Sequence, residues 1–294
     1  MSQPRPASMQ SAAETPRQFA GGMSRTGVLV VGHGTADPVG AEETRAVARQ
    51  AAALLPTMPV ELGFLEVIGP SIADAMRELA GQGCQRVVIA PLLLLTAGHA
   101  RRDVPEAVVD AAGQHGIDVM QGAALGCHPD MLTLSRQRRR EALADRAATA
   151  PEETILVMLG RGSSAPDGVA QFREWVVASL ADDQTVHPQF EIGFAAAARP
   201  TLDEALEAAA ARRPRRVVVQ PHLLFRGHVE QQVTAAISRW QAMCPHIDWA
   251  PVARLGADGR VAEALVSRAR DAASTGFGDP AGFSREKNLS PEAG

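Results

Sequence analysis

The chain has 294 residues, of which 46% are apolar, and a formal net charge of -4. This length allows two domains that each bury a core, and the negative charge gives no general reason to expect nucleic-acid binding. The cysteines are far apart and form no Cys-x-x-Cys pair, which argues against a disulfide framework, a structural zinc site and an iron–sulfur cluster; they are Cys84, Cys127 and Cys244. We therefore expect a reducing, cytoplasmic setting.

Both ends of the chain differ in composition from its middle. Residues 1–26 are rich in Pro, Ser, Gln and Ala and lack the continuous apolar stretch of a secretory signal, so we expect a disordered N-terminal tail. Residues 274–294 have a similar composition, and we expect a disordered C-terminal tail there. No apolar run approaches the length needed to cross a bilayer, so we expect no association with a membrane.

Strands and helices alternate through the first half. The strand 28–31 is apolar throughout and ends in Gly32-His33-Gly34, where the glycines let the backbone turn sharply beside the imidazole. Further strands are expected at 60–66, 86–95 and 117–124, and helices at 40–55, 70–80, 101–114 and from His128 onward. Strands that are apolar along their whole length are typical of a parallel sheet covered by helices on both faces.

The second half repeats this series, with strands expected at 154–160, 190–196, 216–224 and 246–253, each followed by a helix. Matching landmarks lie a nearly constant distance apart. Arg161 follows His33 by 128 residues (161 − 33), and Pro200 follows Pro70 by 130 (200 − 70). The pairs Pro91 with Pro221 and Leu125-Gly126 with Leu255-Gly256 also differ by 130 (221 − 91, 255 − 125). We infer that one domain has been duplicated.

The predicted fold is therefore α/β, with two tandem domains that are each an open parallel sheet flanked by helices. We expect the domains at 27–134 and 154–273, joined by 135–153, which would include a basic helix. Arginines are concentrated there and near residue 215, and we interpret both groups as solvated helix ends rather than anion sites. The groups are Arg136 with Arg138 to Arg140, and Arg212, Arg213, Arg215 and Arg216.

Three polar side chains follow successive strands of the first half. They are His33, Glu66 and His99. Ligands of open parallel sheets bind beyond the carboxyl ends of the strands, and two imidazoles with one carboxylate would form a divalent-metal site with open positions. The alternative is structural, because an isolated strand-end histidine is often a hydrogen-bonded structural residue and a helix N-terminus near Pro70 would attract Glu66 electrostatically.

The second half keeps the landmarks but not this set of side chains. Arg161 stands where the first copy has His33, Ala196 stands opposite Glu66, and His228 corresponds to His99. Arginine does not ligate metals but binds carboxylates through its forked guanidinium; the alternative is drift, with Arg161 facing water. We interpret the remaining histidines as structural or surface residues, namely His115, His128, His187, His222 and His246.

The chain resembles the class II chelatases of the sirohydrochlorin cobaltochelatase and ferrochelatase family, in its long, two-copy form. The resemblance rests on VVGHGTADP, FLEVIGPSIADA and APLLLLTAGHARRDVPEA and on the Leu-Gly pair before Pro129. It covers 27–134, and 154–270 as a degenerate second copy. Short members of this family form the same pocket by homodimerising, so the duplication allows a functional monomer. The chain lacks the His-rich tract and the C-terminal iron–sulfur cysteines of some long members.

The resemblance implies insertion of Fe²⁺ or Co²⁺ into sirohydrochlorin, a carboxylated tetrapyrrole, for sirohaem or cobalamin synthesis. It implies that His33, His99 and Glu66 are catalytic and hold the metal, with no cofactor beyond this substrate ion. The choice between iron and cobalt stays open because imidazole and carboxylate ligands suit both. The departures at Arg161 and Ala196 argue against a second metal site.

Our hypothesis is that His33 and His99 bind the metal and accept the pyrrole protons, assisted by Glu66. Candidate partners of the substrate carboxylates are Arg101, Arg102, Arg161, Arg226 and His228. A competing function is a non-catalytic carrier of metal or tetrapyrrole. A metal-dependent hydrolase is disfavoured, since the sequence has neither a nucleophile elbow nor an HExxH motif.

Overall fold

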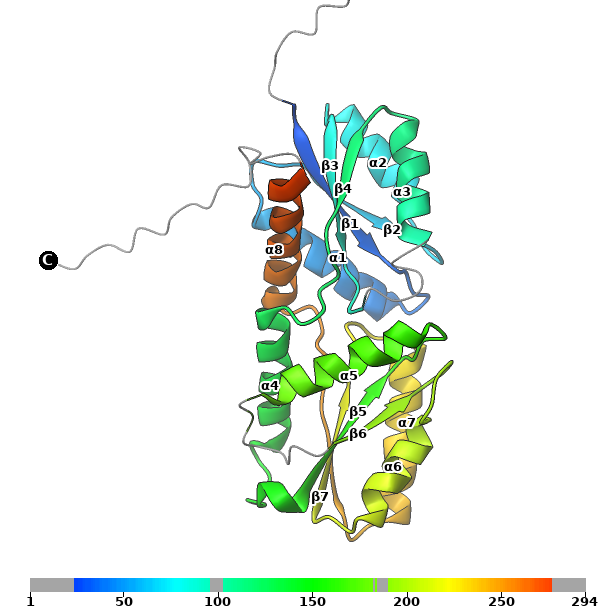
Figure 1. Ribbon diagram of the computed structural model, residues 1–294, viewed down its shortest axis with the longest axis vertical. Coiled ribbons are helices and arrows are strands. Elements are labelled where there is room, and N and C mark those ends of the chain that lie inside the picture. The colour runs from blue at the N-terminus through cyan, green and yellow to red at the C-terminus, as the bar shows by residue number, and fades with distance from the viewer. Residues whose placement is uncertain (1–23, 96–102, 182, 184–189, 277–294) are drawn as a thin grey trace, which may run out of the picture.

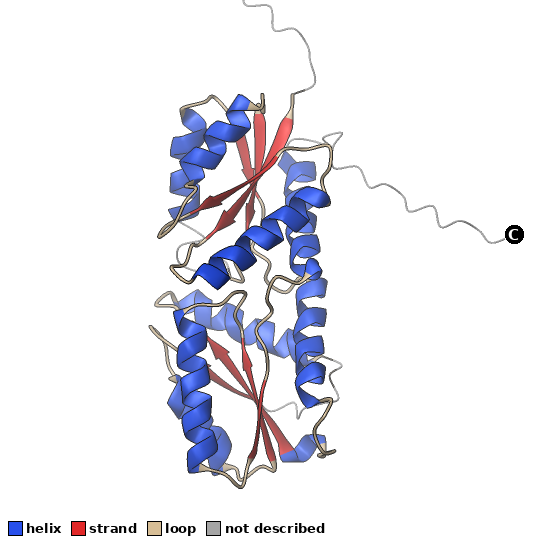
Figure 2. Cartoon of the chain, turned by 180° about the vertical axis from the view of Figure 1, so that it is seen from behind, coloured by secondary structure: helices blue, strands red, loops and turns tan. Residues whose placement is uncertain are grey.

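Two α/β halves follow one another along the long axis of the molecule, each a sheet with helices on both faces (Figure 1, Figure 2). This computed structural model describes residues 24–95, 103–181, 183 and 190–276. Among the helices of these residues, none is long and apolar enough to cross a membrane. The two tails expected at 1–26 and 274–294 lie largely outside the described residues.

In the first half, β1 lies at the centre of a parallel sheet of order β2-β1-β3-β4. Val28 of β1 pairs with Val60 of β2 and with Val88 of β3. Every residue of β1 is buried, because helices cover both faces of the sheet. The elements are β1 (Thr26–Gly32), α1 (Pro38–Ala53), β2 (Val60–Phe64), α2 (Ile72–Gly81), β3 (Arg86–Pro91), α3 (Asp103–Gly113), β4 (Asp118–Gln121) and α4 (Pro129–Leu143).

The second half has the same topology, with the order β6-β5-β7-β8 and all pairs parallel. Leu156 of β5 pairs with Phe190 and Val218, the counterparts of the three residues just named. The predicted pair of tandem parallel sheets is thus confirmed. The elements are the short 3-10 helix η2 (Pro151–Glu153), β5 (Thr154–Gly160), α5 (Pro166–Leu180), β6 (Phe190–Phe194), α6 (Leu202–Ala211), β7 (Arg216–Pro221), α7 (His228–Met243), β8 (Asp248–Pro251) and α8 (Gly259–Gly276).

The apolar run predicted as one strand over 86–95 leaves the sheet after Pro91. The carbonyls of Leu93 and Leu94 instead accept hydrogen bonds from the backbone N–H groups of Leu125 and Gly126, at 2.9 and 3.0 Å. The Leu255-Gly256 pair binds the carbonyls of Leu223 and Leu224 in the same way. In each copy the Leu-Gly pair therefore holds the segment that directly follows the third strand, β3 or β7.

The last helix of each copy covers the sheet of the other copy. Val261 and Leu265 of α8 pack in one core with Val30 of β1 and Val88 of β3. The first turns of α4 reach the same core, but Leu132 and Leu143 of α4 pack on the core of the second sheet. Figure 1 shows α8 beside the first sheet and α4 beside the second. From the sequence, the segment from His128 to residue 134 was expected in the first domain. The sequence did not indicate that α4 and α8 each pack on the sheet of the other copy.

The basic segment that includes α4 is not entirely solvated. Arg139 is fully buried, and its guanidinium donates to the Asp183 carboxylate, to the Gln220 side chain at 2.6 Å and to the Ser179 carbonyl at 2.6 Å. Arg216, in the other group, is also buried and pairs with Asp248 at 2.7 Å. The interpretation of both groups as solvated helix ends is wrong at these two positions, because each arginine meets a carboxylate inside the second half.

Candidate active site between the two halves

His33 follows β1, and the next residue, Gly34, allows the loop after β1 to lie against the loop that carries Glu66. Gly34 has φ +100°, a conformation that favours glycine. A Cβ on Gly34 would lie 1.9 Å from the carbonyl oxygen of Glu66, so a side chain there would prevent the close approach of the two loops. The Glu66 backbone N–H also donates to the His33 carbonyl, at 3.1 Å. These contacts bring the ends of β1 and β2 side by side.

The side chains of His33 and Glu66 meet as a result. His33 Nδ1 lies 3.2 Å from Glu66 Oε1, with the imidazole 24% and the carboxylate 52% exposed. A partly exposed imidazole beside a carboxylate can bind a divalent cation through exchangeable ligands, or can be oriented by the carboxylate for metal binding. The structure therefore brings together two members of the predicted metal set.

His99, Arg101 and Arg102 lie outside the described residues, so the structure does not place them. Within the described ranges, no group of three or more His, Cys, Asp and Glu side chains could hold a metal ion. The third metal ligand predicted from the sequence, His99, thus stays a prediction.

The second copy builds the same loop with different side chains. Gly162 has φ +91°, and a Cβ there would lie 1.8 Å from the Ala196 carbonyl oxygen. The Ala196 N–H donates to the Arg161 carbonyl at 2.9 Å, as Glu66 does to His33. The second copy therefore keeps the positive-φ glycine and the backbone hydrogen bond between the two loops, but has neither the imidazole nor the carboxylate.

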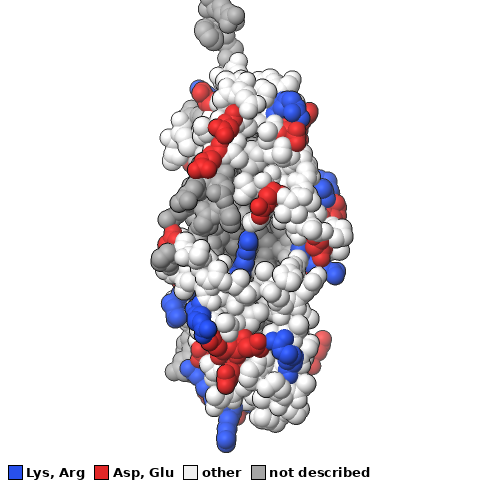
Figure 3. All heavy atoms as spheres, turned by 90° about the vertical axis from the view of Figure 1, so that its right-hand side faces the viewer, with Lys and Arg blue, Asp and Glu red and all other residues white. Residues whose placement is uncertain are grey.

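Arg161 reaches across to its counterpart in the first copy. Its Nη1 lies 3.0 Å from Nε2 of His33. Arginine only donates hydrogen bonds, so Nε2 must accept, and the ring proton must then be on Nδ1, facing Glu66. Arg161, one of the candidate partners of the substrate carboxylates, thus contacts the first copy. In Figure 3 the surface is hollowed between the halves, with basic atoms inside the hollow and acidic atoms above it.

Arg226 and His228, two more predicted substrate ligands, lie where β7 leads into α7. The Arg226 Nε lies 3.3 Å from Asp37 Oδ2, and its backbone N–H donates to Glu43 at 2.9 Å. Gly40 of α1 permits this contact, since a Cβ there would lie 2.0 Å from the Arg226 carbonyl oxygen. His228 is exposed at the first position of α7. Arg226 therefore joins the two halves.

Sequence reasoning missed Arg254, which lies after β8. Its guanidinium pairs with Glu43 of α1 and with Glu230 of α7, each at 2.5 Å. Burial disfavours its charge, but hydrogen bonds to the two carboxylates outweigh this and raise the pKa of Arg254. Because Glu43 is 211 residues away in the sequence, no local pattern indicates this contact between the halves.

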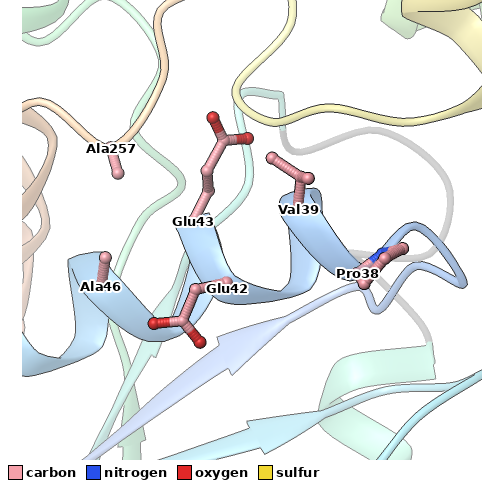
Figure 4. A pocket seen from close by; sticks show the side chains of 6 residues that line it. All are labelled: Pro38, Val39, Glu42, Glu43, Ala46 and Ala257. Carbon is pink, nitrogen blue, oxygen red and sulfur yellow. The ribbon is translucent and has the colours of Figure 1, made fainter.

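A separate pocket of about 360 Å³ lies between α1 and the loop that carries Ala257 of the second half, next to this ion-pair cluster (Figure 4). It is lined by Pro38, Val39, Glu42, Glu43, Ala46 and Ala257. It includes none of the predicted site residues, so it is distinct from the candidate active site.

Comparison with known proteins places these features in a family. The CbiX family model matches the chain twice, over residues 27–142 and 155–272. The chain belongs to the CbiX family. The two matches include most of α4 and most of α8, so each family unit includes the helix that packs on the other copy.

Several relatives of this CbiX protein are named for metal insertion. A sirohydrochlorin cobaltochelatase of Priestia megaterium is 26% identical over 252 residues, covering 85% of this chain and 81% of the relative. A sirohydrochlorin ferrochelatase of the same organism is 30% identical over 207 residues, covering 70% and 76%. A sirohydrochlorin cobaltochelatase of Methanothermobacter thermautotrophicus is 37% identical over 138 residues, which cover 94% of that protein but 40% of this chain. That relative therefore has the length of a single copy.

Solved structures share the two-copy fold. SirB from Bacillus subtilis with Fe³⁺ has a TM-score of 0.73, 24% identity, and coverage of 87% of this chain and 99% of SirB. The sirohydrochlorin chelatase SirB from Bacillus subtilis subspecies spizizenii in complex with cobalt has a TM-score of 0.70 and 25% identity over 87% of this chain and 98% of that one.

Proposed function

We propose that this CbiX protein is a sirohydrochlorin chelatase, which inserts Fe²⁺ or Co²⁺ into the tetrapyrrole for sirohaem or cobalamin synthesis. The observation that carries the proposal is the His33–Glu66 pair, which lies at the strand ends where the two halves face each other. Its relatives named for the same reaction include both iron and cobalt enzymes. The reaction exchanges one divalent ion for the two N–H protons of the macrocycle.

The chemistry of this pair suits transfer rather than storage of a metal. A neutral imidazole and a carboxylate bind Fe²⁺ or Co²⁺ without the tight grip of thiolates, so four pyrrole nitrogens can take the ion over. The Glu66 carboxylate lies 3.2 Å from Nδ1, where its negative charge favours a proton, and this leaves Nε2 as the metal-binding nitrogen. We propose that His99 supplies the second imidazole, and that these groups also accept the released protons.

Positive charge around the hollow would hold the substrate carboxylates. We propose Arg161 as the principal contact, with Arg101, Arg102, Arg226 and His228 as further candidates. Arg161 is exposed and extends from the second copy towards His33. Arg226 would have to share its charge with Asp37.

The remaining expectations follow from the same arrangement. We propose that one chain is the active unit, because both copies of the fold are present in it. We propose that no cofactor is needed beyond the substrate ion. We also propose a reducing, cytoplasmic setting, which agrees with the free thiols of Cys84, Cys127 and Cys244.

Insertion can be followed by absorbance after mixing the full chain with metal-free sirohydrochlorin and Fe²⁺ or Co²⁺, each alone and in competition. We expect repeated turnover by the wild type and a loss of at least about a hundredfold in His33→Ala. Arg49→Ala, an exposed change on α1, is the control and should keep full activity. Binding of both substrates without turnover would instead identify a carrier and refute the proposed enzyme.

A further inference from the structure

The guanidinium of Arg161 occupies the position from which His33 would bind a metal ion. Its Nη1 is 3.0 Å from Nε2 and donates to the only lone pair of that nitrogen. A metal held by an imidazole nitrogen lies about 2.0–2.1 Å away along the same direction. The metal and Arg161 therefore cannot occupy this nitrogen together.

Binding of the metal to the other nitrogen of His33, Nδ1, would also be opposed by Arg161. Nδ1 faces Glu66, and a metal bound there would require the proton to move to Nε2. Nε2–H would then point at the N–H of Arg161, donor against donor. In either tautomer, Arg161 in its present position opposes metal binding by His33.

Charge acts in the same direction. The guanidinium of Arg161 carries a positive charge, so it repels a divalent cation that approaches within a few ångströms. Arg226 and Arg254, by contrast, are paired with Asp37, Glu43 and Glu230. Among the described residues, no carboxylate forms an ion pair with Arg161, so none of them neutralises its charge beside His33.

A carboxylate would be a better partner for Arg161 than the neutral imidazole. Guanidinium and carboxylate form two parallel, charge-assisted hydrogen bonds, which are stronger than one bond to a neutral ring. The contact with His33 is solvent-exposed and breaks at small cost. A carboxylated ligand that enters the hollow can therefore draw Arg161 away.

We propose that Arg161 caps His33 in the substrate-free protein, and that a carboxylate of the tetrapyrrole removes the cap. The macrocycle then binds first, and its binding exposes Nε2 to the incoming metal. This order keeps the free protein from retaining metal ions that have no acceptor. The proposal rests on the proposed function for the identity of the carboxylated ligand, but the cap itself is a property of the free chain.

The test is titration of the metal-free full chain with Co²⁺, without tetrapyrrole, by calorimetry or by the visible absorbance of bound cobalt. We expect Arg161→Ala to bind Co²⁺ about tenfold more tightly than the wild type, since both the hydrogen bond and the repulsion are lost. Arg161→Gln keeps a donor and loses the charge, so its affinity should fall between the two. Arg49→Ala removes an equal charge from the outer part of α1 and should change the affinity less than twofold.

Reciprocal behaviour is expected for metal-free sirohydrochlorin, which should bind Arg161→Ala about tenfold more weakly than the wild type. Equal Co²⁺ affinities of wild type, Arg161→Ala and Arg161→Gln, with all three melting at similar temperatures, would overturn the cap. A wild type that inserts no metal, beside an Arg161→Ala that binds Co²⁺ more tightly, would refute the chelatase and leave the cap standing. A wild type that inserts metal, with the same Co²⁺ affinity in wild type and Arg161→Ala, would refute the cap and leave the chelatase standing.

Discussion

Arg139 of α4 and Asp183 of the second half are joined by two hydrogen bonds, at 2.9 and 2.7 Å, although both side chains are fully buried. Gln220 and Ser135 complete the network around the guanidinium. Buried charges are tolerated only when they are paired and hydrogen-bonded. This network therefore fixes the position of α4 on the sheet of the second half.

Removing Arg139 should destabilise the protein strongly. In Arg139→Ala the Asp183 carboxylate stays buried without its counter-charge, and we expect a loss of about 3–5 kcal/mol in the free energy of unfolding. Arg140→Ala, one residue further on the same helix and exposed, should change it by less than about 0.5 kcal/mol. Denaturant unfolding monitored by circular dichroism measures both. Similar midpoints for the two variants would contradict the role given to Arg139.

The glycine after His33 should be indispensable for the site. Gly34→Ala places a methyl group 1.9 Å from the Glu66 carbonyl at a positive φ, so the two loops must separate. We expect a loss of more than about 2 kcal/mol in stability and loss of metal insertion. Gly81→Ala, at the end of α2 with open space around it, is the matched control and should be neutral or slightly stabilising. Insertion at wild-type rate by a stable Gly34→Ala protein would show that the close approach does not position His33.

Glu66 should act on the metal through His33. Glu66→Gln keeps the shape of the side chain but cannot stabilise Nδ1–H with a negative charge, so we expect Co²⁺ to bind about 10–100 times more weakly. Calorimetric titration measures this, with Glu42→Gln on the exposed side of α1 as the control. An unchanged affinity would remove Glu66 from the metal site and leave the structural interpretation of its position.

His222 should make the protein sensitive to acid. Burial lowers the pKa of His222 to about 3, and its ring packs on Trp175 at a centroid distance of 3.9 Å. Since the unfolded chain takes up a proton near pH 6.5 and the folded chain does not, stability is full above that pH and falls as the pH decreases towards 3. The loss at pH 5 relative to pH 8 is about 2 kcal/mol for this group.

His222→Leu tests this dependence, because the first copy has Leu92 at the corresponding place. Leu92 and His222 each donate a backbone N–H to the central strand, to Val31 and Leu159 respectively. The variant should lose about 2 kcal/mol less than the wild type between pH 8 and pH 5. Parallel stability curves for the two proteins in denaturant unfolding over this range would show that His222 does not titrate as argued.

Much of the fold was predictable because it depends on local signals. The fully apolar strands, the regular spacing of Pro70 with Pro200 and the Leu-Gly pairs predict two parallel sheets, as the structure has them. The expected helix start at Pro70 moves to Ile72, because Ser71 and Asp74 form a capping box. Strand ends were predicted too late wherever an apolar run continues without a neighbouring strand, as at Leu92 to Leu95.

The closeness of His33 and Glu66 was predictable, whereas the contacts between the two copies were not. Strand-end position marks His33 and Glu66, since parallel strands end at one edge. The contact of Arg161 with His33, the exchange of α4 and α8, and the burial of Arg139 all depend on how the copies dock. Residues 117 to 211 positions apart meet there, as at Arg138 with Leu255 and Arg254 with Glu43, and no short-range pattern records such distances.

Because α4 and α8 change places, neither repeat is a separable module. A gene cut at the joint would encode two sheets that each lack part of one apolar cover, one of them carrying His33 and Glu66. The second repeat has Arg161 and Ala196 in place of His33 and Glu66, but the first sheet still needs its last helix. The final helix of the second repeat, α8, covers the sheet of the first repeat. The half that carries His33 therefore depends on the other half for its own folded structure.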